Sequence, residues 1–150
     1  MMTSEKVDLI YTALSLAQGE FPEIDRNSKV SVLMKSVRTY DFEYAALDHI
    51  LSKVRPVLKK HSLSINFGFE SIKDECDYVE TRLGHSSGQF LSTKIPLISP
   101  SQSMQELGAS ITYARRYGAQ LILGIFAESD NDANEIEPKT KTFTKTTTNP

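Results

Sequence analysis

The chain has 150 residues, of which 39% are hydrophobic and 24% are charged. That length and composition suit one globular domain with a hydrophobic core of its own. A formal net charge of −2 excludes a uniformly basic surface that would coat nucleic acid. No apolar run is long enough for a membrane span, and the single cysteine, Cys76, cannot form a disulfide within the chain. We therefore expect a cytoplasmic protein with no membrane segment.

The charges are unevenly distributed along the chain. Residues 1–127 carry 14 acidic and 14 basic residues, whereas residues 128–137 alone carry five of the 19 acidic ones. The segment that follows is rich in threonine and lysine. Because residues 128–150 have too few large apolar side chains to offset the entropy of ordering them, we expect a flexible tail there. The folded domain is expected over residues 1–127.

The first half of the domain alternates between helical and strand periodicity. Apolar residues at helical spacing predict a helix over residues 4–18, with Ser4 as its N-cap. Alternating apolar residues then predict two strands between residues 30 and 44. A second amphipathic helix is predicted over residues 44–60. Because Pro56 lacks a backbone N–H donor, we expect it to kink or interrupt this helix.

The second half of the domain reads as three strands and a long helix. Strands are predicted over residues 63–69, 78–83 and 90–95, the last two forming a hairpin. A helix is predicted over residues 103–124. The order of these elements predicts an α+β fold, in which helices pack on one face of an antiparallel sheet. The apolar face of the last helix consists of Leu107, Ile111, Ala114, Gly118, Leu121 and Ile125.

Motifs for catalysis or cofactor binding are missing from the sequence. No glycine is followed by lysine, so the chain lacks a GxxxxGK[ST] phosphate loop, which argues against ATP use. The histidines at 49, 61 and 85 lack the spacing of a zinc site, and no pair of carboxylates stands out as a general acid and base. We therefore expect a binding protein, without a metal or cofactor, and not an enzyme.

The acidic segment that follows the last helix resembles the start of a calcium loop. Asp130, Asp132 and Asn134 match the pattern D-x-D-x-N. However, Glu135 stands where the loop needs glycine, and Lys141 stands where it needs a bidentate glutamate. The sequence therefore excludes an EF-hand, and only weak magnesium binding by this segment stays open.

One group of polar residues on the last helix is typical of phosphate recognition. Thr112, Arg115 and Arg116 lie opposite the apolar face, and Tyr113 and Tyr117 lie one turn apart beside them. Guanidinium forks match phosphate oxygens, and tyrosine rings can stack on bases or on the arginines. The same spacing is also typical of a helix whose arginines pair with glutamates and whose tyrosines pack in the core.

Three stretches of the chain carry a resemblance to a known family. They are AQGEFP at residues 17–22, the segment from YDFEY at residue 40 to LKKHSLS, and GASITYARRYGAQLILGIFAESDNDAN at residues 108–134. In this order they resemble the ERF (essential recombination function) family of phage single-strand annealing proteins. Two departures are Ser62, where the family usually has glycine, and the short tail.

The resemblance implies a fold similar to that of single-strand annealing proteins, assembled as a homo-oligomer in rings or filaments. The implied activity is ATP-independent binding of single-stranded DNA and annealing of complementary strands, in homologous recombination of a phage or mobile element. It would act in the cytoplasm of a bacterial host cell. The implied partners are single-stranded DNA and a phage exonuclease or host single-strand binding protein.

Further basic residues are weaker candidates for contact with DNA. Arg82 and Lys94 are expected on polar faces of adjacent strands, where they meet across the hairpin or pair with nearby acids. Lys35 and Arg38 lie at or beside the first pair of strands. Two other functions stay open: a passive module that protects single-stranded DNA without annealing it, and an enzyme such as a nuclease, which would need clustered carboxylates around a metal.

Overall fold

The computed structural model describes residues 1–33, 39–71, 76–97 and 103–126, and the side chains of these residues except those between 30 and 42. Lys35, Arg38 and the tail from residue 127 on lie outside the described residues. The predictions made for them, including magnesium binding by the acidic segment, stay predictions.

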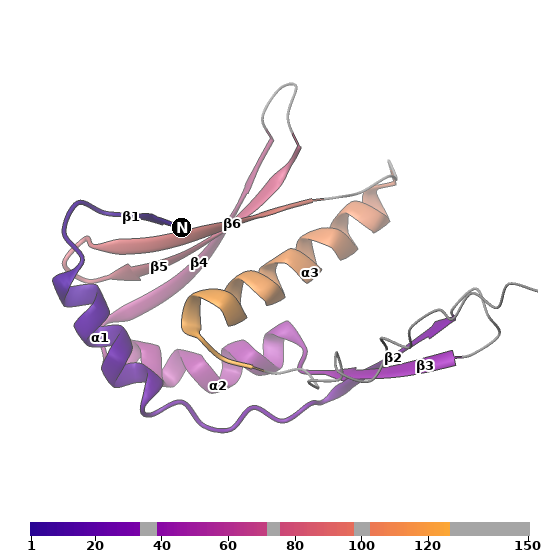
Figure 1. Cartoon of the computed structure of the whole chain (residues 1–150), viewed down its shortest axis with the longest axis horizontal. Coiled ribbons are helices and arrows are strands. Elements are labelled where there is room, and N and C mark those ends of the chain that lie inside the picture. Colours follow the sequence, from indigo (N-terminus) through magenta and orange to yellow (C-terminus); the bar gives the residue numbers. More distant parts are fainter. Residues whose placement is uncertain (34–38, 72–75, 98–102, 127–150) are drawn as a thin grey trace, which may run out of the picture.

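The body of the protein is a four-stranded antiparallel sheet with helices on one face (Figure 1). Its strand order is β1 (Met2–Thr3), β6 (Phe90–Pro96), β5 (Tyr78–His85) and β4 (Leu63–Glu70). Figure 1 shows that α1 (Asp8–Gln18), α2 (Leu47–Lys60) and α3 (Met104–Leu123) all lie on the same side of this sheet. The predicted α+β class is therefore confirmed.

The strands β2 (Ser28–Leu33) and β3 (Thr39–Tyr44) form a separate two-stranded sheet. Their antiparallel register pairs Ser28 with Tyr44 at the base of the hairpin, immediately before α2 begins. In Figure 1 this hairpin projects from the body on the side where the N-terminal end of α3 also lies. Two strands were predicted here, but the sequence did not indicate that they form a sheet of their own.

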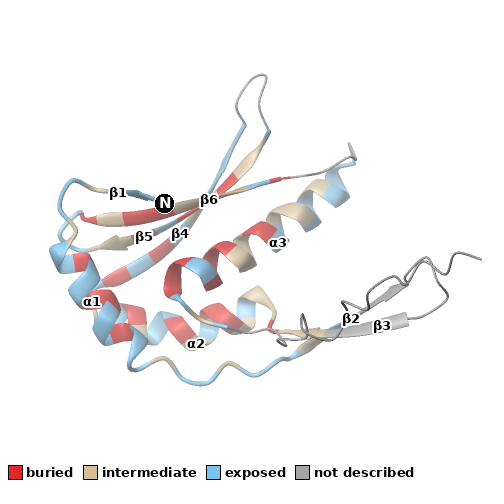
Figure 2. Ribbon diagram, in the orientation of Figure 1, coloured by how far each residue is buried: buried red, intermediate tan, exposed pale blue. Residues whose placement is uncertain are grey.

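The hydrophobic core lies between the large sheet and the helices, where red residues gather in Figure 2. Side chains along β5 point alternately to the two faces of the sheet. Val79, Thr81 and Leu83 therefore all face the helices, where they are buried and form part of the sheet side of the core. Each large aliphatic side chain buried here stabilises the fold by about 1.5–3 kcal/mol. The most deeply buried large aliphatic side chains are Ile10, Ile50, Val54, Leu58, Val79, Leu83, Leu91 and Leu123.

Helix α3 has well-defined ends and a very close contact with β5. The Ser103 side chain caps the helix: it accepts a hydrogen bond from the Glu106 N–H (3.2 Å) and donates one to the Glu106 carboxylate (2.6 Å). Gly124 ends the helix in the left-handed region, with φ of 65°. At Gly118 the helix approaches Thr81 so closely that an added Cβ would lie 2.1 Å from the threonine Oγ1. This contact sets the height of α3 above the sheet.

The prediction that Ser4 caps the first helix is wrong. The Ser4 hydroxyl donates to the Lys6 carbonyl (2.6 Å) and accepts from the Phe90 N–H (3.0 Å), so it closes the turn after β1. Helix α1 begins only at Asp8 and has no side-chain cap of its own. Instead, the buried Gln89 side chain accepts hydrogen bonds from the backbone N–H groups of residues 9 and 10.

Two further details differ from the sequence prediction. Helix α2 runs without interruption through Pro56, which lies on its exposed side, where water can satisfy the carbonyl left without a donor. Leu121, predicted on the apolar face of α3, is 62% exposed, although its neighbours Ile122 and Leu123 are buried.

Candidate nucleic-acid interface

Arg115 lies on the flank of α3 that faces β4. Its guanidinium carbon is 4.9 Å from the centre of the Phe67 ring, so the cation rests on an aromatic platform. The Nε atom is buried and makes no hydrogen bond within the described part of the chain. No carboxylate among the described residues forms an ion pair with it. A cation held without an anionic partner is available to an anionic ligand.

Two hollows beside Arg115 also share a second arginine, Arg55 of α2. The first has a volume of about 420 Å³ and is bounded by β4 and α3. The second has a volume of about 310 Å³ and lies against α2, where Asp48 contributes a carboxylate. Arg55 was not among the predicted contact residues, because its position on an exposed helix face is typical of solvated basic residues. Only its position beside Arg115 in the fold distinguishes it.

Arg116 is surrounded by aromatic rings. Its guanidinium carbon lies 4.1 Å from the ring centre of Tyr44 and 5.3 Å from the ring centres of both Tyr113 and Tyr117. The two α3 tyrosines contact each other, with ring centres 4.3 Å apart. The predicted stacking of tyrosines on an arginine is thus confirmed for Arg116. This cluster connects α3 to the base of the β2–β3 hairpin through Tyr44.

Thr112 and Tyr113 are exposed on α3. The Thr112 hydroxyl donates a hydrogen bond to the Gly108 carbonyl one turn earlier (3.0 Å), so its proton is already in use and the oxygen is left as an acceptor. Tyr113 is 55% exposed. Besides contacting Arg116, it lines a hollow of about 380 Å³ on the β6 side of the helix, which is mostly apolar.

Arg82 and Lys94 lie on the opposite face of the sheet from α3. Thr81 faces Gly118, so its neighbour Arg82 points to the other side, and Lys94 shares that side because it pairs with Glu80 across the β5–β6 ladder. Arg82 contacts the Phe90 ring and donates to Glu80 (3.0 Å), and Lys94 forms an ion pair with Glu70. The fold therefore does not bring these two residues together with Arg115.

The pKa of Glu80 agrees with its pairing to Arg82. Partial burial alone would raise the pKa of this carboxyl, but the hydrogen bond from Arg82 and its positive charge help to outweigh burial and hold the pKa below its ordinary value. Glu80 is therefore ionised at neutral pH and offsets much of the positive charge of Arg82. The outer face of the sheet, which carries Arg82 and Lys94, is thus less suited to an anionic ligand than the surface between α3 and β4, where Arg115 and Arg55 lie. We call this surface the α3–β4 flank.

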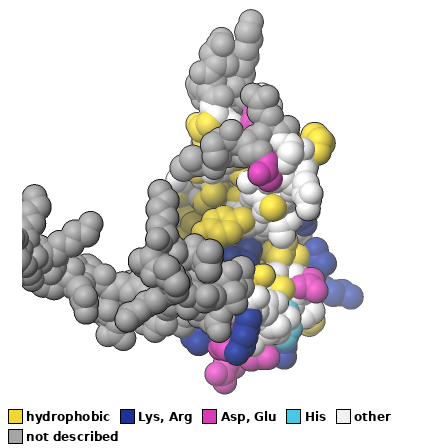
Figure 3. Space-filling model, turned by 90° about the vertical axis from the view of Figure 1, so that its right-hand side faces the viewer, with side chains coloured by type: hydrophobic (Ala, Val, Ile, Leu, Met, Phe, Trp, Pro, Cys, Tyr) yellow, Lys and Arg dark blue, Asp and Glu magenta, His cyan; other side chains and the backbone are white. Residues whose placement is uncertain are grey.

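Figure 3 shows the end of the molecule where the β2–β3 hairpin and the N-terminal end of α3 lie. On this face, hydrophobic side chains gather and dark-blue Lys and Arg atoms lie at their lower border. A cation beside aromatic and aliphatic surface is the combination that single-stranded nucleic acid needs, since the backbone is anionic and the bases are flat and apolar.

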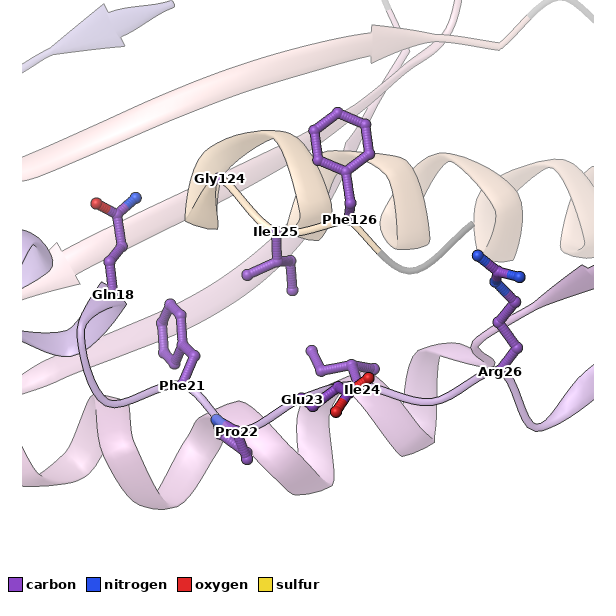
Figure 4. A pocket seen from close by; sticks show the side chains of 9 residues that line it. All are labelled: Gln18, Phe21, Pro22, Glu23, Ile24, Arg26, Gly124, Ile125 and Phe126. Atoms are coloured by element: carbon purple, nitrogen blue, oxygen red, sulfur yellow. The ribbon is translucent and has the colours of Figure 1, made fainter. Parts of the chain in front are cut away.

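A further hollow of about 360 Å³ lies where α3 ends (Figure 4). Figure 4 shows Phe21, Ile24 and Ile125 pointing into the space between the two chain segments. These three side chains also pack against the main core, so the hollow is part of the joint between residues 21–26 and the end of α3.

No group of three or more histidine, cysteine, aspartate or glutamate side chains that could hold a metal ion occurs among the described residues. Within the same residues, no helix combines the length and the apolar character needed to cross a bilayer.

The fold and this surface define an α+β protein with a cationic, aromatic flank on its last helix. Comparison with family models assigns it further: the chain belongs to the ERF superfamily, whose model matches residues 10–150. Membership implies a phage recombination protein of the single-strand annealing kind, a group that is generally non-enzymatic. Neither the curated proteins nor the solved structures contain a match to the chain.

Proposed function

We propose that this protein binds single-stranded DNA along the α3–β4 flank and anneals complementary strands without ATP, in homologous recombination of a phage or mobile element. The observation that carries the proposal is Arg115, a cation on the Phe67 ring without a carboxylate partner among the described residues. Arg55 beside it adds a second guanidinium. Two guanidiniums beside the same hollow can bind a phosphate of the DNA backbone together.

In this mechanism the protein holds one strand in position and neutralises its charge. Arg55 and Arg115 bind phosphates, and the exposed ring of Tyr113 offers a stacking surface to a base. Arg116 keeps α3 and the β2–β3 hairpin in place through its contacts with aromatic rings. Annealing then needs no covalent step, because duplex stacking supplies about 1.4 kcal/mol per base-pair step.

A homo-oligomeric ring or filament would multiply the few phosphate contacts of each protomer. For single strands the slope of log affinity against log salt is about −0.7 per contact, so an array of protomers binds with a strong salt dependence. The exposed Leu121 is a candidate for the contact between protomers. A phage exonuclease that produces single strands, or a host single-strand binding protein, is the proposed partner.

The experiment that tests this proposal is fluorescence-reported annealing of complementary oligonucleotides, without nucleotide, at several salt concentrations. Arg115→Ala is expected to weaken single-strand binding about tenfold and to slow annealing, because one charge-assisted contact is lost. Arg82→Ala is the matched control: its guanidinium also rests on a phenylalanine ring, but on the other face of the sheet. This variant is expected to anneal at the wild-type rate.

Each other outcome has a defined meaning. Equal loss in both variants would move the site away from the α3–β4 flank. Tight binding without faster annealing would identify a passive module that protects single strands. Loss of intact DNA on adding magnesium would identify a nuclease and overturn the proposal.

A further inference from the structure

The larger of the two hollows beside Arg115 has an aromatic floor that is open to solvent. Phe67 and Phe69 lie two residues apart on β4 and therefore face the same side of the sheet. The Phe67 ring is covered by the Arg115 guanidinium, whereas Phe69 is 49% exposed. A half-exposed phenylalanine beside a hollow of about 420 Å³ is a platform on which a planar, apolar group can stack.

Two guanidinium groups lie beside this platform, where they can bind the phosphate of a nucleotide whose base stacks on the ring. Arg55 and Arg115 both line the hollow.

The charges decide which of the two hollows suits a nucleotide. No carboxylate occurs among the described residues that line the larger one. The smaller hollow, on the other side of the arginine pair, contains Asp48, which would repel a phosphate. A phosphate bound by both guanidiniums therefore places the attached base over β4 and not over α2.

We infer that the hollow over β4 binds one unstacked base of the single strand, face to face with Phe69, while Arg55 and Arg115 hold its phosphate. This inference rests on the proposed function and names a subsite within it. A base that is paired and stacked in a duplex cannot enter the hollow, so the subsite favours single strands over duplexes. Each protomer withholds one base from pairing until the annealed strand leaves the surface.

The experiment measures how removal of the Phe69 ring and removal of the DNA bases each affect binding, alone and together. Wild-type protein and Phe69→Ala are titrated with a short oligothymidylate and with an abasic chain of equal length, which keeps the phosphates and lacks the bases. Stacking on an aromatic ring accounts for about a 5- to 150-fold difference in affinity per base. Phe69→Ala is expected to lose that factor toward oligothymidylate and nothing toward the abasic chain, with the salt slope unchanged.

Two variants control for the fold. Phe69→Leu keeps apolar bulk on β4 and lacks the ring, so it is expected to show the same selective loss as Phe69→Ala. Tyr11→Ala removes a ring that is similarly exposed (48%) on α1 and does not line the hollow, so it is expected to bind both chains like the wild type. Thermal unfolding of each variant confirms that it is folded.

The outcomes separate the subsite from the proposed function. Equal loss toward both chains, or no loss toward either, overturns the base subsite while wild-type binding to oligothymidylate leaves the proposed function in place. Absence of wild-type binding to both chains overturns the proposed function itself.

Discussion

The contact between Gly118 and Thr81 predicts opposite effects for the same substitution at two glycines of α3. An alanine Cβ at position 118 would lie 2.1 Å from the Thr81 Oγ1 and 3.0 Å from the Thr81 Cβ. Carbon atoms normally pack 3.5–4.0 Å apart, so the helix or the strand must move by about 1 Å. At Gly108, an added Cβ would meet nothing within 4 Å.

The magnitudes follow from two opposing effects. Replacing glycine by alanine inside a helix stabilises it by about 1 kcal/mol, whereas overpacking a buried contact costs about 1–3 kcal/mol or more. Because Thr81 is fully buried and β-branched, it cannot rotate away, so we expect the cost at position 118 to lie at the upper end. Gly118→Ala should lower the free energy of unfolding by about 2 kcal/mol, and Gly108→Ala should raise it by about 0.5–1 kcal/mol.

The assay is denaturant and thermal unfolding followed by circular dichroism, with the variant Thr81→Ala added to form a double-mutant cycle. Thr81→Ala removes the Oγ1 and leaves only the Cβ near position 118, so it should restore part of the stability lost in Gly118→Ala. A coupling energy of about 1 kcal/mol or more is expected. Strict additivity, or destabilisation by Gly108→Ala as large as that by Gly118→Ala, would refute the steric explanation.

Four other predictions concern caps, turns, cations and pH. Gln89→Ala should cost about 1–3 kcal/mol, since it leaves backbone donors at the start of α1 without their acceptor. Ser62→Gly should stabilise the fold by about 1 kcal/mol, because the serine φ of 58° lies in the left-handed region. Arg116→Ala should cost about 1–2 kcal/mol through lost ring contacts, measured by thermal unfolding. Hydrogen bonds from Lys60 and His49 lower the pKa of Glu20 and Asp25 below their ordinary values of 4.5 and 3.8. The two ionised carboxylates therefore stabilise the fold above their ordinary pKa values, and this stabilisation is lost as the pH falls through their lower folded-state pKa values. The double variant Glu20→Gln/Asp25→Asn should therefore lose less free energy of unfolding on acidification than the wild type.

Each of these predictions has a control in the same chain. The Gln89 amide also donates to the Asp8 carboxylate (2.9 Å), so Gln89→Glu keeps the acceptor for the α1 donors but should retain more stability than Gln89→Ala only when Asp8→Asn removes the repulsion between the two carboxylates. Ser62→Ala cannot relieve the backbone conformation, so stabilisation by alanine as large as that by glycine would contradict the argument from φ. Arg116→Lys keeps a cation beside the rings and should lose less than alanine. An unchanged acid profile in the Glu20 and Asp25 variant would show that these ion pairs contribute nothing.

The helices and most strands could be predicted because each is encoded by a local pattern. Alternation in β4, β5 and β6 marks one buried face and one exposed face, and the prediction of three strands was correct to within a few residues. The start of α3 was predictable for the same reason, since a capping serine and its glutamate lie only three residues apart. Membership of the ERF superfamily was also predictable from the sequence, because its motifs are contiguous stretches.

The ends of elements were less predictable where distant residues decide them. Ser4 has the chemistry of an N-cap, but the backbone of Phe90 engages its hydroxyl, and the α1 donors are satisfied by Gln89. The competing partner lies more than 80 residues away in the chain. No local pattern contains such information, since it depends on how β6 and α1 meet in the fold.

The sequence by itself determined which residues of α3 are polar, and its periodicity placed Arg115 and Arg116 together opposite the apolar face. Only the tertiary structure decided which residues lie beside each arginine. It places Arg115 against Phe67 and Arg55, Arg116 against Tyr44, and Arg82 behind the sheet. These neighbours come from elements far apart in the chain. Their positions depend on how closely α3 packs on the sheet, and the contact of Gly118 with Thr81 sets that distance.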